Sequence, residues 1–124
     1  MKFYICEHCG NIITKVVDKG VPVMCCGQKM TEIAPKTAEG EAGREKHLPV
    51  VTVDGNNVLV KVGDVPHPMT DEHSIQWVIL ETDKGHLYKD VVGTPEASFV
   101  LADEKVVAVY SYCNLHGLWK TVLA

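Results

Sequence analysis

Hydrophobic and β-branched residues in the second half of the chain come in short runs that turn-forming residues separate. Asp54-Gly55, Lys84-Gly85 and Gly93-Thr94-Pro95 are such turns, and no stretch keeps a helical period over ten residues. The runs predicted as strands are Val50–Val53, Val58–Val62, Ser74–Leu80, Leu87–Val92, Ala97–Ala102 and Val106–Tyr112. The pattern predicts a mainly β chain folded as an antiparallel β-sandwich, with a hairpin at Asp54-Gly55.

The N-terminal part follows a different pattern. Residues 1–34 hold only two short apolar runs, Phe3–Ile5 and Ile12–Ile13, which cannot bury enough surface to fold alone. Such a segment needs a metal, a disulfide or a partner. Residues 35–46 are rich in Pro, Gly, Ala, Glu and Lys and are predicted to form a linker. We therefore expect a small metal-dependent domain over residues 1–36 and a β domain over residues 37–124.

Composition narrows the possible partners and location. Hydrophobic residues make up 46% of the 124 positions, enough for a core, yet no run approaches the ~20 apolar residues of a membrane span. The N-terminus lacks a signal-peptide pattern, so we expect a cytoplasmic protein without membrane contact. The net charge of −4 argues against a nucleic-acid partner. An anionic substrate would need a local positive patch.

The cysteines point to metal binding. The chain has five cysteines, and four of them fall within the first 26 residues. Cys6 and Cys9 form a C-x-x-C pair, whereas Cys25 and Cys26 are adjacent, and a glycine follows each pair. Four thiolates can enclose a tetrahedral zinc or iron ion. Because adjacent residues cannot reach one ion with relaxed geometry, we expect a distorted site, which favours iron over a structural zinc knuckle.

Four of the six histidines lie in loops or at the edges of predicted strands, where functional residues gather. These are His47, His67, His73 and His116, whereas His8 and His86 are interpreted as solvent-facing. Two residues separate Cys113 from His116, so a tight turn can direct both side chains at one metal. Four imidazoles and one thiolate suit a transition metal, and an octahedral ion would keep one open position, as redox chemistry requires.

These motifs resemble those of the desulfoferrodoxins, the two-iron superoxide reductases. The matching segments are E-K-H-x-P at His47, H-P-M at His67, E-H-x-I-x-W at His73 and C-N-L-H-G at Cys113 and His116. The resemblance extends over essentially the whole chain: the N-terminal part is similar to desulforedoxin and the remainder to neelaredoxin. It implies that the four histidines are equatorial iron ligands, that Cys113 is the axial ligand, and that a second iron is bound by Cys6, Cys9, Cys25 and Cys26.

The resemblance also implies an activity and an assembly. It implies one-electron reduction of superoxide to hydrogen peroxide for antioxidant defence, with electrons from a rubredoxin-like donor. A homodimer and a seven-stranded immunoglobulin-like sandwich are further implications. Glu45 and Lys46 would lie on a mobile loop beside the open position. Glu45 would occupy that position in the oxidised enzyme, and Lys46 would attract the incoming anion.

Two other classes of function are compatible with the same residues. One is a non-enzymatic module that binds zinc at both sites, because zinc outranks ferrous iron in intrinsic affinity. The other is a pure electron carrier, which needs neither an open metal position nor a nearby lysine. The role of the N-terminal iron is open as well, between relaying electrons to the catalytic iron and holding its domain and a dimer together.

Overall fold

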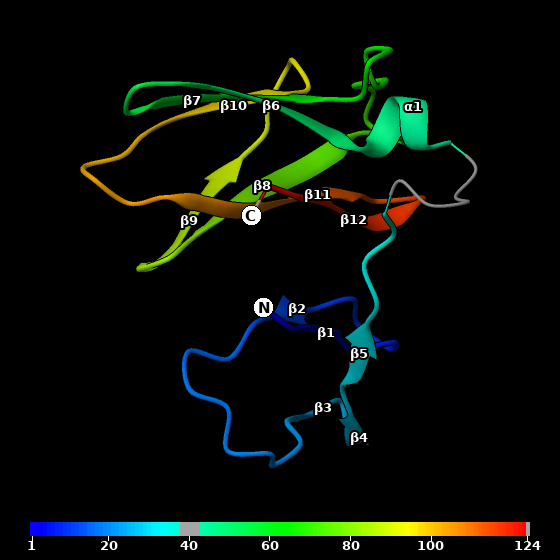
Figure 1. Cartoon of the computed structure of the whole chain (residues 1–124). Helices are drawn as coiled ribbons and strands as arrows, with labels where there is room; N and C mark the ends of the chain where they lie inside the picture. The colour runs from blue at the N-terminus through cyan, green and yellow to red at the C-terminus, as the bar shows by residue number, and fades with distance from the viewer. Residues whose placement is uncertain (38–42, 124) are drawn as a thin grey trace. The chain divides into compact units, whose positions relative to one another are not determined.

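The computed structural model describes residues 1–37 and 43–123, and of Arg44 and Glu45 only the backbone. The chain divides into two units, Met1–Ala34 and Pro35–Ala124, and the division falls two residues before the expected boundary. Figure 1 shows the course of each unit.

The first unit consists of short strands with few buried side chains. One sheet has the antiparallel order β2-β1-β5, and β3 and β4 form a separate hairpin. The strands are β1 (Phe3–Ile5), β2 (Ile12–Ile13), β3 (Met24–Cys25), β4 (Gln28–Lys29) and β5 (Thr31–Ile33). Within this unit only Phe3 and Cys6 are buried. The unit therefore has almost no hydrophobic core of its own.

The second unit is built from two antiparallel sheets that lie as two layers (Figure 1). One has the order β10-β7-β6 and the other β12-β11-β8-β9. The elements are α1 (Arg44–His47), β6 (Pro49–Asp54), β7 (Asn57–Val62), β8 (Ile75–Thr82), β9 (Gly85–Asp90), β10 (Glu96–Val100), β11 (Val106–Cys113) and β12 (Gly117–Val122). The predicted mainly β fold with an antiparallel sandwich is confirmed, as is the hairpin at Asp54-Gly55, which joins β6 and β7.

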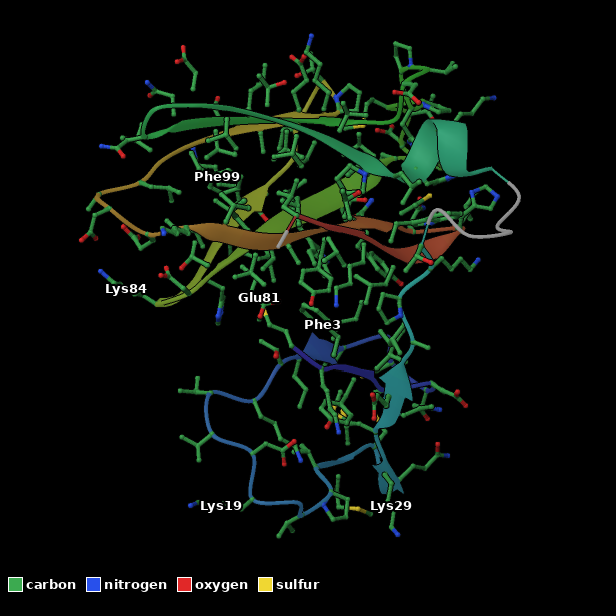
Figure 2. The ribbon with its side chains drawn as sticks, in the orientation of Figure 1. Phe3, Lys19, Lys29, Glu81, Lys84 and Phe99 are labelled. Carbon is green, nitrogen blue, oxygen red and sulfur yellow. The ribbon has the colours of Figure 1, made fainter. Side chains whose placement is uncertain are left out.

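Alternating apolar residues form the core between the two sheets. In β7, Val58, Val60 and Val62 are buried, because successive side chains of a strand point to opposite faces. They pack with residues of the facing sheet such as Leu80. Phe99 of β10 lies between the layers in Figure 2. The same core cluster includes Cys113, so the predicted metal ligand emerges directly from the hydrophobic interior.

The structure departs from the predicted elements in two places. β12 was not expected, and it pairs along its whole length with β11. The linker prediction for residues 35–46 needs correction, because Lys36 exchanges backbone hydrogen bonds with β12 and Arg44–His47 form the helical turn α1. Residues 38–42 of that segment lie outside the described residues. No helix in the described part of the chain is long and apolar enough to cross a membrane.

Candidate metal centres

The β11–β12 hairpin positions two of the predicted ligands. Cys113 is the last residue of β11 and pairs with Gly117, the first residue of β12, so that His116 lies in the loop between them. Gly117 has φ +81°, a left-handed conformation that glycine adopts without strain. This tight turn keeps the Cys113 Sγ and His116 Nδ1 atoms 3.7 Å apart.

Asn114 connects this hairpin to the loop that carries His73. Its Oδ1 accepts a hydrogen bond from the Ser74 backbone N–H at 3.0 Å, and its Nδ2 donates to the Glu72 carbonyl at 2.9 Å. The backbone N–H of His73 in turn donates to Thr70 Oγ1 at 3.1 Å. The Asn114 side chain thus holds both residues that flank His73 against the hairpin.

His47, the last residue of α1, is held by contacts with β11 and β12. The buried Ser111 hydroxyl donates a hydrogen bond to the His47 carbonyl at 2.9 Å. The Trp119 ring stacks on the His47 imidazole, with centroids 4.9 Å apart and an interplanar angle of 13°. These contacts orient the imidazole ring independently of a metal ion.

The four predicted histidines form a closed cycle of rings. Successive centroid distances along His47, His67, His73 and His116 are 4.7, 4.6 and 5.0 Å, and 4.7 Å closes the cycle back to His47. Neighbouring rings are inclined by 63° to 79°, while the opposite pair His47 and His73 is 6.4 Å apart. Such an arrangement matches four imidazoles around one equatorial plane.

Hydrogen bonds to backbone carbonyls define the nitrogen that each ring directs inward. His47 Nδ1 lies 2.8 Å from the Gly43 carbonyl and His67 Nδ1 lies 2.7 Å from the Pro68 carbonyl. A carbonyl can only accept, so both Nδ1 atoms carry the proton and both Nε2 atoms present a lone pair. Burial lowers the pKa of His47 and lowers the pKa of His67 to about 4, so both rings are neutral near pH 7.

Two of the inward-facing nitrogens lack a hydrogen-bond partner among the described residues. His67 Nε2 and His73 Nε2 are buried and make no hydrogen bond to the described residues. His47 Nε2 and His116 Nδ1 are 3.1 Å apart, close to the ~3.0 Å between neighbouring corners of an octahedron with metal–nitrogen bonds of about 2.1 Å. The four nitrogens and Cys113 Sγ all lie within 4.8 Å of one another. The residues therefore fit a transition-metal ion such as iron.

The four N-terminal cysteines form a second group, with their Sγ atoms within 4.8 Å of one another. Cys9 Sγ and Cys25 Sγ are 3.6 Å apart, near the ~3.8 Å edge of a tetrahedron with metal–sulfur bonds of about 2.3 Å. Cys26 has φ +52°, the one non-glycine residue with a positive φ in the described chain. The adjacent cysteines Cys25 and Cys26 thus both reach the site because the backbone of Cys26 is left-handed. Functional sites often retain local backbone strain of this kind.

Polar hydrogens surround the sulfur atoms of this group. The backbone N–H of Cys9 points at Cys6 Sγ at 3.5 Å, and Asn11 Nδ2 donates to Cys25 Sγ at 3.6 Å. The N–H groups of Cys9 and His8 lower the pKa of Cys6 to about 6. The neighbouring Cys6 and Cys9 raise the pKa of Cys25 and raise the pKa of Cys26 to about 12, so all four sulfur atoms become thiolates together only beside a cation such as a bound metal ion.

The remaining sequence candidates lie as follows. Lys46 is exposed and directly precedes His47 in α1, while the side chain of Glu45 lies outside what the structure describes. His8 and His86 are exposed, as predicted. Sequence reasoning missed Lys36, whose Nζ donates to the His116 carbonyl at 3.2 Å and lies 5.3 Å from the Trp119 ring centroid. Its position in a presumed linker gave no signal of this contact.

A comparison with protein families agrees with this geometry. The family model described as Desulfoferrodoxin matches residues 39–122. The chain belongs to the desulfoferrodoxin family. The desulfoferrodoxin of Nitratidesulfovibrio vulgaris is 42% identical over 122 residues, which cover 96% of this chain and 94% of the relative.

Two of the similar proteins are described as superoxide reductases. The crystal structure of the superoxide reductase from Treponema pallidum has a TM-score of 0.79 and 38% identity, covering 97% of this chain and 95% of that one. The superoxide reductase of Pyrococcus furiosus is 32% identical, and the alignment covers 71% of this chain and 94% of the relative.

Proposed function

We propose that this desulfoferrodoxin-family chain is a superoxide reductase, which converts superoxide and two protons to hydrogen peroxide with one electron. The observation that carries the proposal is the cycle of four imidazoles, with two orphaned buried nitrogens and Cys113 Sγ beside it. Its relatives from Treponema pallidum and Pyrococcus furiosus are described as superoxide reductases, which supports the same activity here.

His47, His67, His73, His116 and Cys113 are the proposed ligands of a mononuclear iron. When bound in the ferrous state, the ion supplies the single electron that the reaction consumes. Neutral imidazoles leave the charge of the site positive, because one thiolate offsets only part of the charge of a divalent ion. Hydrogen bonds to Gly43 and Pro68 keep the His47 and His67 rings in the tautomer that ligation needs.

The burial of the five residues supports an open coordination position on the solvent side. Cys113 is fully buried within the core, whereas His73 is half-buried and His116 exposed. An anion arriving from solvent would therefore meet the histidine side of the site. Five protein donors leave one position of an octahedron for it.

Lys46 and Glu45 are proposed to act at this open position. Lys46 is exposed and adjacent to His47, so it can provide the local positive charge that a chain of net charge −4 needs for an anionic substrate. We assign Glu45 the role of occupying the position in the oxidised enzyme, by analogy with the family.

Cys6, Cys9, Cys25 and Cys26 are the proposed ligands of a second mononuclear iron. Their thiolate chemistry, the exposed Cys9 and Cys26, and the strained Cys26 backbone support an iron–tetrathiolate site that an external reductant can approach. We further propose two domains, residues 1–36 and 37–124, a rubredoxin-like electron donor, a homodimer and a cytoplasmic location. Removal of this metal separates the two roles proposed for the second iron, electron relay and support of its domain.

Pulsed superoxide tests the proposal directly. The ferrous protein is mixed with superoxide and followed optically, while peroxide and oxygen are measured. A superoxide reductase yields peroxide without releasing oxygen, whereas dismutation would release oxygen and a pure electron carrier would not react at the histidine site. Metal analysis and the visible spectrum separate iron from zinc, because zinc protein is colourless. Failure to consume superoxide in iron-loaded protein would reject the proposed activity.

A further inference from the structure

Three aromatic side chains cross the four-stranded sheet from β11 through β8 to β9. The rings of Tyr112 and Trp77 are stacked, with centroids 5.5 Å apart and an interplanar angle of 6°. The Trp77 and Tyr88 centroids are 6.1 Å apart. The strand register explains the row, since Trp77 pairs with Tyr112 on one side and with Asp90, two residues from Tyr88, on the other.

The row begins one residue from a proposed iron ligand and ends at the surface. Tyr112 is joined to Cys113 by a single peptide bond. Trp77 is buried, and Tyr88 is 52% exposed. A continuous series of aromatic contacts therefore leads from the residue next to a proposed metal ligand to a tyrosine that solvent can reach.

The surface end is suited to lose an electron. Tyrosine and tryptophan are among the side chains most easily oxidised by one electron, and a tyrosine gives up its phenol proton when this occurs. The Tyr88 hydroxyl donates a hydrogen bond to Asp90 Oδ1 at 2.6 Å, so the carboxylate can take that proton directly. Partial desolvation of the phenol and this hydrogen bond raise the pKa of Tyr88 to about 12, so the phenol holds its proton until oxidation.

Other aromatic residues near the site are less suited. Trp119 stacks on His47, but Lys36 Nζ lies 5.3 Å from its ring centroid, and a positive charge opposes removal of an electron. Tyr110 has Lys120 Nζ 5.4 Å from its centroid and is fully buried, so no solution reductant can reach it.

We propose that Tyr112, Trp77 and Tyr88 form an oxidation-protection path, which draws electrons from the protein surface when hydrogen peroxide reacts at the histidine–cysteine site. This inference rests on the proposed function, because peroxide is the product of that reaction and ferrous iron is its proposed metal. Its role is distinct from turnover, since superoxide reduction needs only the electron of the iron.

The electron balance shows why such a path is needed. One peroxide, two electrons and one proton give one hydroxide and one water. The ferrous ion supplies one electron, so the second must come from the chain or from damage to a ligand. Along the path it comes from Tyr88, whose phenol O–H bond breaks to leave a tyrosyl radical, with the proton passing through Asp90. A thiol reductant then gives a hydrogen atom to the radical and restores the phenol.

The experiment treats the ferrous holoprotein with hydrogen peroxide and freezes it for electron paramagnetic resonance, with ring-deuterated tyrosine to identify tyrosyl radicals. Peptide mass spectrometry then locates the oxidised residues. We expect a radical at Tyr88, and a several-fold loss of that signal in Tyr88→Phe, Trp77→Phe and Asp90→Asn. Oxidation of Cys113 to its sulfinic or sulfonic acid should rise in the same variants.

Tyr110→Phe is the matched control, because it removes a phenol from the same sheet outside the path. It should leave the Tyr88 radical unchanged. Equal signals in wild type, Tyr88→Phe and Trp77→Phe would overturn the path, as would an equal loss in Tyr110→Phe. Tyr88 is exposed, so Tyr88→Phe tests the path even if Trp77→Phe fails to fold. Superoxide consumption by the same wild-type sample reports separately on the proposed function. A Tyr88 radical in a sample that does not consume superoxide would support the path and reject the proposed function.

Discussion

At the scale of single residues, the side chains around the proposed ligands matter as much as the ligands themselves. Trp119 and Ser111 orient His47, and Asn114 holds the loop of His73. None of these three is a metal ligand. Each acts through packing or a hydrogen bond, the kind of contact whose loss lowers metal affinity by about 10-fold to 100-fold.

Asn114→Ala should therefore weaken metal binding at the histidine–cysteine site. It removes the hydrogen bonds to Ser74 and Glu72 while leaving all five donors in place, so we expect an affinity loss on the order of tenfold. Competition with a chelator, followed through the thiolate absorption band, measures the change. Asn57→Ala, at the far hairpin of β6 and β7, is the control and should bind metal as the wild type does.

Lys46→Ala tests the source of the local positive charge. The chain carries a net charge of −4, so its distant field repels superoxide, and Lys46 is exposed next to His47. We expect a second-order rate lower by roughly tenfold at low salt, a difference that shrinks as salt rises, and an unchanged iron spectrum. Lys105→Ala removes another exposed lysine elsewhere and should have little effect. An unchanged rate for Lys46→Ala at low salt would rule out steering by this residue.

At the scale of secondary-structure elements, one glycine determines how closely α1 approaches the sandwich. Gly63 follows β7 and has φ +87°, and its N–H donates to the Leu48 carbonyl at 2.9 Å. A Cβ atom there would lie 2.6 Å from the Lys46 carbonyl oxygen and 2.5 Å from that of Val65. The backbone of α1, which carries His47 on its last residue, can take this position only because residue 63 is glycine.

Gly63→Ala should consequently displace α1 and misplace His47. Gly93 provides a matched control, because it has φ +84° and nothing within 4 Å of its own hypothetical Cβ. Gly93→Ala should lose only the roughly 1–2 kcal/mol of a left-handed alanine. Gly63→Ala should lose more in denaturant unfolding and should also bind metal less tightly at the histidine site. Equal losses with equal metal affinity would show that α1 tolerates the extra methyl group.

The same elements show what could be read from the sequence. The Asp54-Gly55 hairpin and the alternating strands were predictable because their signals are local. β12 was missed because Gly117, the turn glycine at its start, belongs to the Cys113–His116 motif and was assigned to metal binding instead of to a hairpin. Lys36 was assigned to a linker from composition, whereas its partners, Leu118 and Lys120, lie far along the chain.

The site was predictable to the extent that family motifs mark it. The resemblance brought together the five residues whose donor atoms the structure places within 4.8 Å of one another. The spacing of a motif identifies candidate ligands, but it does not reveal stacked rings or hydrogen bonds between residues far apart in the sequence. The supporting contacts of Trp119 and Asn114, and the left-handed Cys26, therefore required the structure.

At the scale of the whole molecule, the two units differ in what stabilises them. Buried residues of both sheets give the second unit a hydrophobic core that includes Val60, Leu80 and Val109. The first unit buries only Phe3 and Cys6, and it leaves Val16 95% exposed. We expect a unit of this size with so little buried apolar surface to depend on a metal held by its four cysteines, because metal binding contributes a free energy of the order of 10 kcal/mol in small metal-binding domains.

Removing one thiolate from each site should consequently give opposite results. Cys9→Ser takes a ligand from the four-cysteine group, and we expect backbone amides of β1 and β5 to exchange with deuterium as in an unfolded chain, while β7 and β11 stay protected. Cys113→Ser takes a ligand from the other site and should leave the first unit protected, because the four N-terminal thiolates remain. Hydrogen exchange measured by peptide mass spectrometry separates the two. Protected amides in β1 of Cys9→Ser after loss of its metal would mean that the first unit folds without the ion, which would favour electron relay over structural support as the role of that site.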